Sequence, residues 1–306
     1  SVDPQDYTAT RRWTLGVQAT EVGSHFRSIA NDLLPSDKAM QGLFAQYLHD
    51  RWLIDSALAR ETNNLDDLAE RSTTEIRQGH VQVNYTDYMP QDSGLHAWLG
   101  SPAHSVRVQR ARGQDRTTAP GLFPTDYTTD TVTTALQFNQ THWNWGLGYT
   151  YSRFEDHADT QVDTDTRTSS VNTQFLIDPR LTLTLGGQLQ TTRNRDFGTR
   201  ADYRIATIGT QFILIPDRLF GQLNAQFNAD RARRDPFFAR DTRQDVYGGE
   251  LVWRWLQPEQ AAASVDVVLS VASQSWRDHV FQQSIDGHQI FLSLRSSLPV
   301  SYNGGL

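Results

Sequence analysis

Residues 181–190 read Leu181-Thr-Leu-Thr-Leu-Gly-Gly-Gln-Leu-Gln190. Leucine occupies positions 181, 183, 185 and 189, and threonine, glycine and glutamine occupy the positions between them. Successive side chains of a β-strand point to opposite sides, so a period of two predicts a strand with one apolar face and one hydrophilic face. The fold class follows from how often this pattern recurs.

The same alternation is found in three further segments. Apolar residues alternate with glutamine and asparagine in 219–228, with glycine, asparagine and threonine in 143–151, and with Glu250 and Arg254 in 250–255. We call the two sets of alternating positions the apolar phase and the hydrophilic phase of a strand. The hydrophilic phase is rich in amides and small residues. This repetition predicts an all-β protein with many amphipathic strands.

Turn signals divide the chain into about fourteen such strands, although twelve or sixteen would also fit. Pro90 and Pro102 interrupt the pattern within 89–113 and could conceal a further hairpin, and the weakly helical segment 65–77 is interpreted as a loop. The expected strands are 8–21, 38–49, 51–61, 75–87, 95–113, 129–142, 143–155, 166–178, 180–196, 201–216, 218–233, 244–256, 260–276 and 285–298.

Strand length and connection length decide which face points inward. Several expected strands exceed the five to six residues usual in sandwiches. The turns at 177–180 and 215–218 are tight, whereas 61–73, 114–128, 154–166 and 232–244 are long polar loops. This asymmetry is typical of a closed transmembrane antiparallel up-and-down β-barrel, in which the apolar phase faces lipid. We expect one barrel domain over 1–306, and leave open whether it was excised from a longer chain with an N-terminal periplasmic region. A soluble β-sandwich or β-solenoid is the alternative.

Composition excludes several classes of function. The chain has no cysteine and a net charge of −7 with a pI near 5.7, which argues against disulfide frameworks, thiolate chemistry and a nucleic-acid partner. His80, His96 and His104 form the densest histidine group, but their spacing is wider than metal ligands usually show. Because no recognisable nucleophile–base pair is present, we expect no enzymatic activity, no metal and no cofactor.

Charged residues on the hydrophilic phase are the candidate functional residues. An arginine facing lipid at the bilayer midplane would cost roughly 2–4 kcal/mol, so these side chains should face the lumen. They would either line a water-filled pore or pair with one another. The candidates are Asp55, Arg107, Asp230, Glu250, Arg254, Asp266 and Arg295.

Most of the acidity is expected in two loops. Solvated loops are one interpretation, and an acidic vestibule that attracts a cationic solute is the other. The residues concerned are Glu61, Asp66, Asp67 and Glu70 in the first loop, and Glu155, Asp156, Asp159, Asp163 and Asp165 in the second.

Aromatic residues near segment ends match the girdles that hold barrels at the headgroup level. Stacking on sugar rings is the alternative role. The residues are Trp13, Trp52, Trp143, Trp145, Trp253, Trp255, Trp276, Tyr149 and Tyr151.

The long amphipathic strands, the turns such as His49-Asp50-Arg51-Trp52 and the final strand Gln289-Ile-Phe-Leu-Ser-Leu-Arg295 resemble those of Gram-negative outer-membrane porins. The length and strand style are similar to the C-terminal barrels of exopolysaccharide exporters of the PelB, PgaA and BcsC type. This resemblance implies a bacterial outer-membrane channel, and the even count of fourteen strands predicts that both termini lie on the short-turn, periplasmic side. The resemblance also implies secretion of a hydrophilic polysaccharide, for which a cationic polymer is one candidate, with outer-membrane lipid and periplasmic secretion proteins as partners. A passive-diffusion porin and a closed structural or binding barrel are the alternatives.

Overall fold

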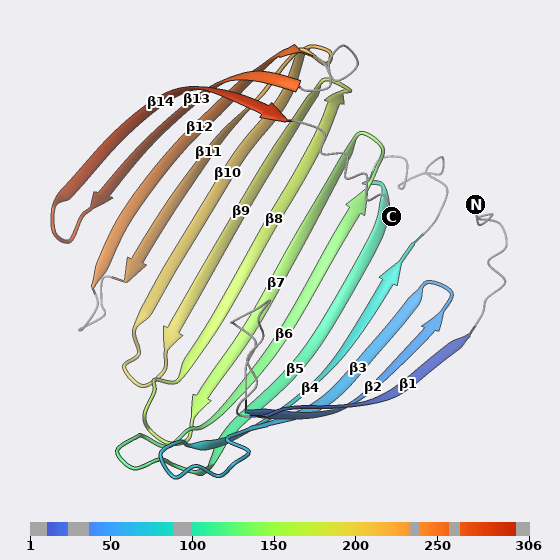
Figure 1. The fold of residues 1–306 in the computed structure, drawn as a ribbon, viewed down its shortest axis with the longest axis vertical. Helices are drawn as coiled ribbons and strands as arrows, with labels where there is room; N and C mark the ends of the chain where they lie inside the picture. Colours follow the sequence, from blue (N-terminus) through green and yellow to red (C-terminus); the bar gives the residue numbers. More distant parts are fainter. Residues whose placement is uncertain (1–10, 24–36, 88–98, 233–238, 257–263, 298–306) are drawn as a thin grey trace, which may run out of the picture. The chain divides into compact units, whose positions relative to one another are not determined.

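The computed structural model describes residues 11–23, 37–87, 99–232, 239–256 and 264–297, and these form fourteen β-strands (Figure 1). They are β1 (Arg12–Val22), β2 (Lys38–His49), β3 (Trp52–Asn63), β4 (Thr73–Thr86), β5 (Ser101–Thr117), β6 (Asp126–Asn139), β7 (Trp143–Asp156), β8 (Thr164–Asp178), β9 (Leu181–Asn194), β10 (Arg200–Ile215), β11 (Leu219–Ala232), β12 (Arg240–Leu256), β13 (Ser264–Asp278) and β14 (Gln283–Ser297).

The strands are hydrogen-bonded in chain order from β1 to β14, which is an up-and-down antiparallel topology. The predicted all-β class and the predicted count of fourteen are confirmed. Pro102 is the second residue of β5, at a strand start where a missing N–H is tolerated, and 88–98 lie outside the described residues. Closure of the sheet into a ring stays a prediction.

The strands extend further into the predicted loops than the apolar pattern indicates. The connections span 64–72, 118–125 and 157–163, so the predictions of 61–73, 114–128 and 154–166 were too long. Glu61, Glu155, Asp156 and Asp165 consequently lie at strand ends, which corrects their placement in loops. Cross-strand ion pairs explain the difference, because they keep the ladder together where apolar side chains end.

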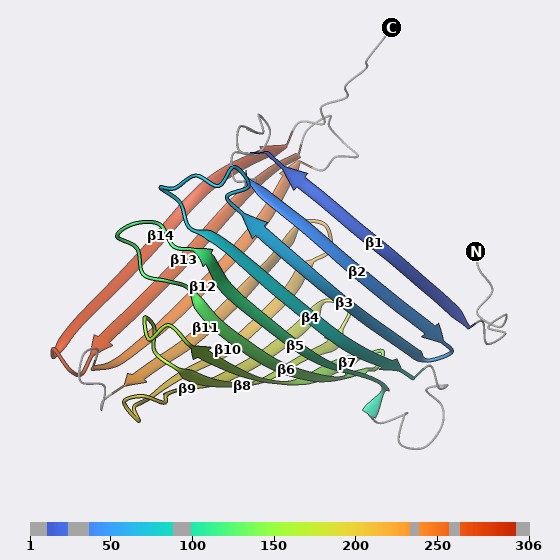
Figure 2. The same cartoon turned by 90° about the horizontal axis from the view of Figure 1, so that it is seen from below.

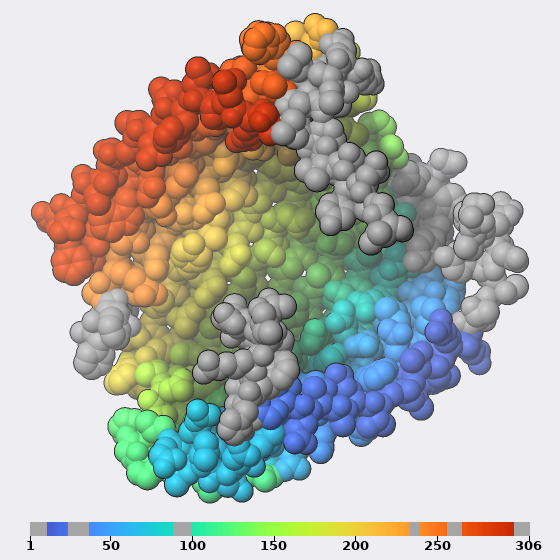
Figure 3. Space-filling view, viewed as in Figure 1, coloured from blue at the N-terminus to red at the C-terminus, as the bar shows by residue number. Residues whose placement is uncertain are grey.

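The chain divides into two compact units. Unit 1 comprises 1–138, 147–169 and 191–200, and unit 2 comprises 139–146, 170–190 and 201–306. Within unit 1, β1 to β5 lie side by side in chain order, which Figure 2 shows in blue to teal. Within unit 2, the side chains of β10 (yellow) to β14 (red) lie against one another along the strands (Figure 3).

The connections of unit 1 alternate between two edges of its sheet. Since neighbouring strands are antiparallel, the loops 64–72, 118–125, 157–163 and 195–199 of unit 1 share one edge of that unit, here named the loop edge. The opposite edge of unit 1 carries the tight turn after His49. Asp50 there has a φ of 51°, a left-handed conformation that aspartate adopts more readily than most residues.

Each unit has an apolar face and a polar face. In unit 1 the register places Val17 opposite Leu43, Leu43 opposite Leu58, and Leu58 opposite Gly79. This side of the sheet is the apolar face of unit 1. In unit 2 the apolar face carries Ile208, Leu223 and Leu269, and the other face of each unit is its polar face.

The described residues bury almost no hydrophobic side chains. Only Ala119, Ala232, Val252 and Val268 are buried hydrophobic residues in the described ranges. A soluble domain of this size would bury a large apolar core. None of the described helices is long and apolar enough to cross a membrane.

Candidate functional site

The polar face of unit 2 carries a row of amides. Gln222, Asn224, Gln226 and Asn228 follow one another on alternate positions of β11. The Gln226 side chain donates a hydrogen bond to Asn228 Oδ1 at 3.0 Å, and Asn228 donates to Gln244 Oε1 on β12 at 3.3 Å. These amides keep donors and acceptors available to a hydrated ligand.

A glycine makes room for this row. A Cβ atom at Gly248 would lie 2.5 Å from Asn224 Oδ1, which is far inside van der Waals contact. Glycine opposite asparagine therefore lets the amide lie flat on the sheet.

Four of the predicted charged residues come together on the polar face of β12, β13 and β14. The Arg254 guanidinium donates two hydrogen bonds to Asp266, at 3.0 and 3.4 Å. The Arg295 guanidinium donates to both carboxylate oxygens of Glu250, at 3.2 and 3.3 Å, across the intervening strand β13. The charges thus pair within the wall of the sheet, and their lining of a pore stays a prediction.

The other three predicted charges are placed separately. Asp230 accepts a hydrogen bond from Arg240 at 2.9 Å near the ends of β11 and β12. Asp55 lies 2.8 Å from His80 Nε2. Gln82 lies between Asp55 and Arg107 in one row of the register.

The three clustered histidines of the sequence do not form a metal site in the described residues. His80 contacts Asp55, and His104 Nε2 lies 3.0 Å from Thr134 Oγ1 on β6. No group of three histidines, cysteines or carboxylates suited to a metal ion occurs in the described ranges, and His96 lies outside them.

Asn64 organises the first acidic loop, which carries Asp66, Asp67 and Glu70. Its side-chain amide donates to the carbonyls of Leu68 and Arg71 at 3.1 Å each and to Thr73 Oγ1 at 2.9 Å. The predicted acidic residue Glu61 instead forms an ion pair with Lys38 at 2.5 Å.

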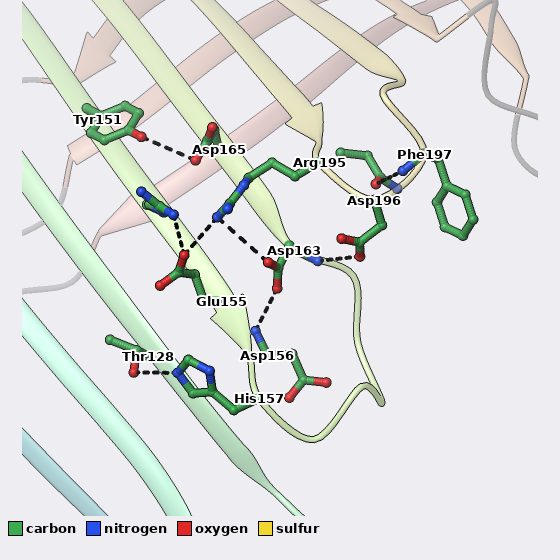
Figure 4. Close-up of polar contacts among 12 residues, drawn as sticks. Thr128, Tyr151, Glu155, Asp156, His157, Asp163, Asp165, Arg195, Asp196 and Phe197 are labelled. Carbon is green, nitrogen blue, oxygen red and sulfur yellow. Dashed lines mark hydrogen bonds and ion pairs between the residues drawn. The ribbon is translucent and has the colours of Figure 1, made fainter.

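Arg195 joins the ends of β7, β8 and β9 at the second acidic segment (Figure 4). Its guanidinium lies 2.9 Å from Glu155 Oε1 and 3.7 Å from Asp163 Oδ2. Arg153 also pairs with Glu155. The hydrogen bond to Glu155, together with the nearby Asp163 and Asp165, raises the pKa of Arg195 above its usual value. Much of this predicted acidity is therefore neutralised by arginine.

Asp156 holds the loop 157–163 in place. Its carboxylate accepts hydrogen bonds from the backbone N–H groups of Thr160 and Gln161 at 2.5 and 2.6 Å, and from the Thr160 hydroxyl at 3.0 Å. Burial raises the pKa of Asp156, but these hydrogen bonds outweigh it, and the net pKa lies below the usual value. The remaining acidic residue of this loop, Asp159, has a φ of 53°.

Most of the predicted aromatic residues lie on the apolar faces. Trp13 lies 4.3 Å from Tyr47, and Trp52 lies 4.8 Å from Tyr85, measured between ring centroids. Both pairs are next to the turn edge of unit 1, opposite its loop edge. Trp276 is the exception, because it shares a register row with Gln244 on the polar face.

An arginine cluster on the apolar face of unit 1 escaped the sequence analysis. At the loop edge the apolar phase of β3, β4 and β5 changes from aliphatic side chains to arginine. The signal was present in the sequence, since each arginine keeps the phase of Leu58, Gly79 or Val108. The arginine cluster consists of Arg60, Arg77, Arg110, Arg112 and Arg116.

Glu75 is the centre of this cluster. Its carboxylate is 7% exposed and accepts hydrogen bonds from Arg60 at 2.9 Å, Arg77 at 2.5 Å and Arg116 at 2.6 Å. One carboxylate therefore holds three guanidinium groups that remain partly exposed on their outer sides.

No protein-family model matches the chain, and no curated protein matches it. Among solved structures, it is similar to the outer membrane channel DcaP of Acinetobacter baumannii, with 9% identity, a TM-score of 0.46 and coverage of 94% of this chain and 96% of that chain. The anion-selective porin from Comamonas acidovorans gives 10% identity, a TM-score of 0.37 and coverage of 94% and 99%. OccAB4 of Acinetobacter baumannii has 10% identity and a TM-score of 0.34, with coverage of 94% of this chain and 85% of that chain. Similarity at this level assigns no family.

Proposed function

We propose that this chain is an outer-membrane β-barrel channel through which small hydrophilic solutes diffuse passively. The observation that carries the proposal is the exposed apolar face of each unit. Val17, Leu58 and Leu223 are 77%, 64% and 52% exposed, while the opposite face of unit 2 holds the amide row and the pairs of Arg254 with Asp266 and of Arg295 with Glu250. Soluble monomers rarely expose large contiguous apolar patches, whereas a lipid-facing wall requires one.

The dimensions of the apolar face suit a bilayer. On β4 the apolar phase begins at Tyr85 and ends at Arg77, eight residues away. That separation is about 27 Å along the strand, or about 21 Å in height for a strand tilted by about 40°. The lipid-facing band of outer-membrane barrels is about 25 Å tall. Aromatic residues at one limit and charged residues at the other would place this band between two headgroup regions.

The polar face would form the wall of the solute path. Its carboxylates and guanidiniums pair within the wall, as Arg254 does with Asp266, so the wall offers hydrated but nearly neutral contacts. We therefore expect weak ion selectivity and passage of small solutes without strong binding.

Export of a polysaccharide is the second candidate. The amide row from Gln222 to Asn228 favours it, because side-chain amides donate to and accept from sugar hydroxyls. A closed barrel, whose ion pairs would fill the lumen, is the third.

Single-channel conductance in a planar bilayer separates these candidates. The purified chain should give steady current that neutral oligosaccharides reduce only at high concentration. Block at micromolar oligosaccharide would favour export. A chain that inserts into the bilayer and carries no current would contradict both channel proposals.

A further inference from the structure

Three shallow hollows follow one another along the apolar face of unit 1. The first, about 560 Å³, is lined by Leu15, Val81 and the three residues Val17, Leu43 and Leu58. The second, about 710 Å³, shares those three residues. The series therefore begins as a groove with an aliphatic floor.

The second hollow continues from this floor to the arginine cluster. It is lined also by Arg60, Arg77, Arg110 and Arg112. The third hollow, about 400 Å³, shares Arg77 and Arg112 with it and adds Arg116 and Glu75. An amphiphile laid along the face would thus meet aliphatic side chains first and guanidinium groups at the loop edge.

Gly79 keeps the groove open between its aliphatic part and its arginine-lined part. It lies opposite Leu58 on β3 and Arg110 on β5, and a Cβ atom there would come within 2.7 Å of Leu58 Cδ2. A larger side chain would therefore fill the passage between the aliphatic floor and the arginines.

The arginine cluster has more positive charge than its acidic partners neutralise. Glu75 forms ion pairs with three of the arginines. Arg110 lies 3.5 Å from Asp130, and Arg112 lies 3.5 Å from Asp126. Asp115 also lines the third hollow, so five guanidiniums against four carboxylates leave a net charge of +1. Arg77 and Arg110 are each 71% exposed, so their donors are accessible to an anion.

We propose that this groove binds a phosphorylated lipid of the leaflet on the loop side, with acyl chains over Val17, Leu43 and Leu58 and phosphate at the arginine cluster. The planar guanidinium fork matches a phosphate group and binds it with charge-assisted hydrogen bonds. The proposal rests on the proposed function, since it requires the apolar face to contact lipid. In an outer membrane the lipid of that leaflet is a phosphorylated glycolipid, and lipid A is the probe for it.

Titration of the detergent-purified full chain with lipid A, followed by native mass spectrometry, tests the site. The double variant Arg110→Gln/Arg112→Gln should bind lipid A about tenfold more weakly. Lipid A stripped of its phosphates should bind the unaltered chain more weakly by a similar factor. Gly79→Leu should reduce binding by obstructing the groove. Arg243→Gln, which removes an exposed arginine paired with Asp245 in unit 2, is the matched control and should leave binding unchanged.

Equal binding of lipid A by the double variant and the unaltered chain would overturn the site. Displacement of lipid A by millimolar inorganic phosphate would also overturn it, because the ligand would then be free phosphate. If the double variant fails to fold, as judged by the heat-dependent gel shift of barrels, Arg110→Gln alone makes the same comparison. Bilayer conductance of the same preparations separates the two proposals. Normal conductance with indiscriminate lipid binding overturns only the lipid site, and failure of every preparation to insert overturns the channel and the lipid site together.

Discussion

Glu75 is the residue whose loss should matter most to unit 1. It is nearly buried and compensates three guanidiniums, so Glu75→Gln would leave Arg60, Arg77 and Arg116 repelling one another. Removing one partner from a fully buried ion pair costs about 3–5 kcal/mol. Since these arginines are half exposed, we expect a loss of about 1–3 kcal/mol in the free energy of unfolding, measured by denaturant titration in lipid vesicles.

Glu70→Gln is the matched control for this variant, because Glu70 lies in the loop 64–72 and is exposed. It should change the free energy of unfolding by less than about 0.5 kcal/mol. Equal stability of the Glu75→Gln and Glu70→Gln proteins would contradict the role assigned to Glu75.

Glu250 tests the polar face as the wall of the solute path. Glu250→Gln would leave the Arg295 guanidinium without its carboxylate partner and make the wall more positive. The ratio of anion to cation permeability should rise about twofold, as measured by the reversal potential in a salt gradient. An unchanged ratio would show that this face does not line the conducting path, and Glu70→Gln again serves as the control.

At the scale of an element, the loop 157–163 should be more sensitive to acid than its neighbours. Asp156 holds it through hydrogen bonds to the ionised carboxylate, which depress its pKa. A depressed folded-state pKa means that the stabilisation is present above the unfolded pKa of about 3.9 and is lost as the pH falls through the folded value. Proteolysis of this loop should therefore accelerate only in strong acid. In Asp156→Asn it should already be fast at neutral pH, and equal rates in both proteins at pH 7 would contradict this assignment.

The existence and order of the strands could be predicted from alternation together with turn signals, but the strand ends could not. Alternation reports burial on one face, and it fades where β5 continues to Arg116 and where β6 begins at Asp126, since these residues are charged rather than aliphatic. Those strand ends are held by ion pairs, and a single sequence does not reveal the pairing of charges on neighbouring strands.

The candidate site was predictable as a set of residues and not as a set of contacts. The alternation of apolar and hydrophilic positions was enough to place Glu250, Arg254, Asp266 and Arg295 on one face. Their partners depend on register, and Glu250 reaches Arg295 over the whole width of β13. The arginine cluster was missed for a different reason. Candidate charges were sought only on the hydrophilic phase, whereas arginine on the apolar phase is costly at the bilayer midplane and much less so toward the interfaces.

At the scale of the whole molecule, the distribution of side chains is the reverse of a soluble protein. In the described ranges four hydrophobic residues are buried, while residues of the apolar faces such as Val17, Leu43, Leu223 and Trp253 are half exposed or more. Burying apolar surface is the main favourable contribution to folding, so such a chain would gain little stability in water. Lipid is the solvent in which this distribution is stable.

The central claim is that the apolar faces contact lipid. The chain has no cysteine, so a spin label attaches only at a single introduced thiol and reports on that one position. Labels at Leu58→Cys and Leu223→Cys, on the apolar faces, are compared with labels at Gln82→Cys and Asn224→Cys on the polar faces, all in lipid vesicles. We predict that labels at 58 and 223 collide mainly with oxygen, which dissolves in lipid, and labels at 82 and 224 mainly with a water-soluble nickel complex. Frequent collision of the nickel complex with the labels at 58 and 223 would contradict the account.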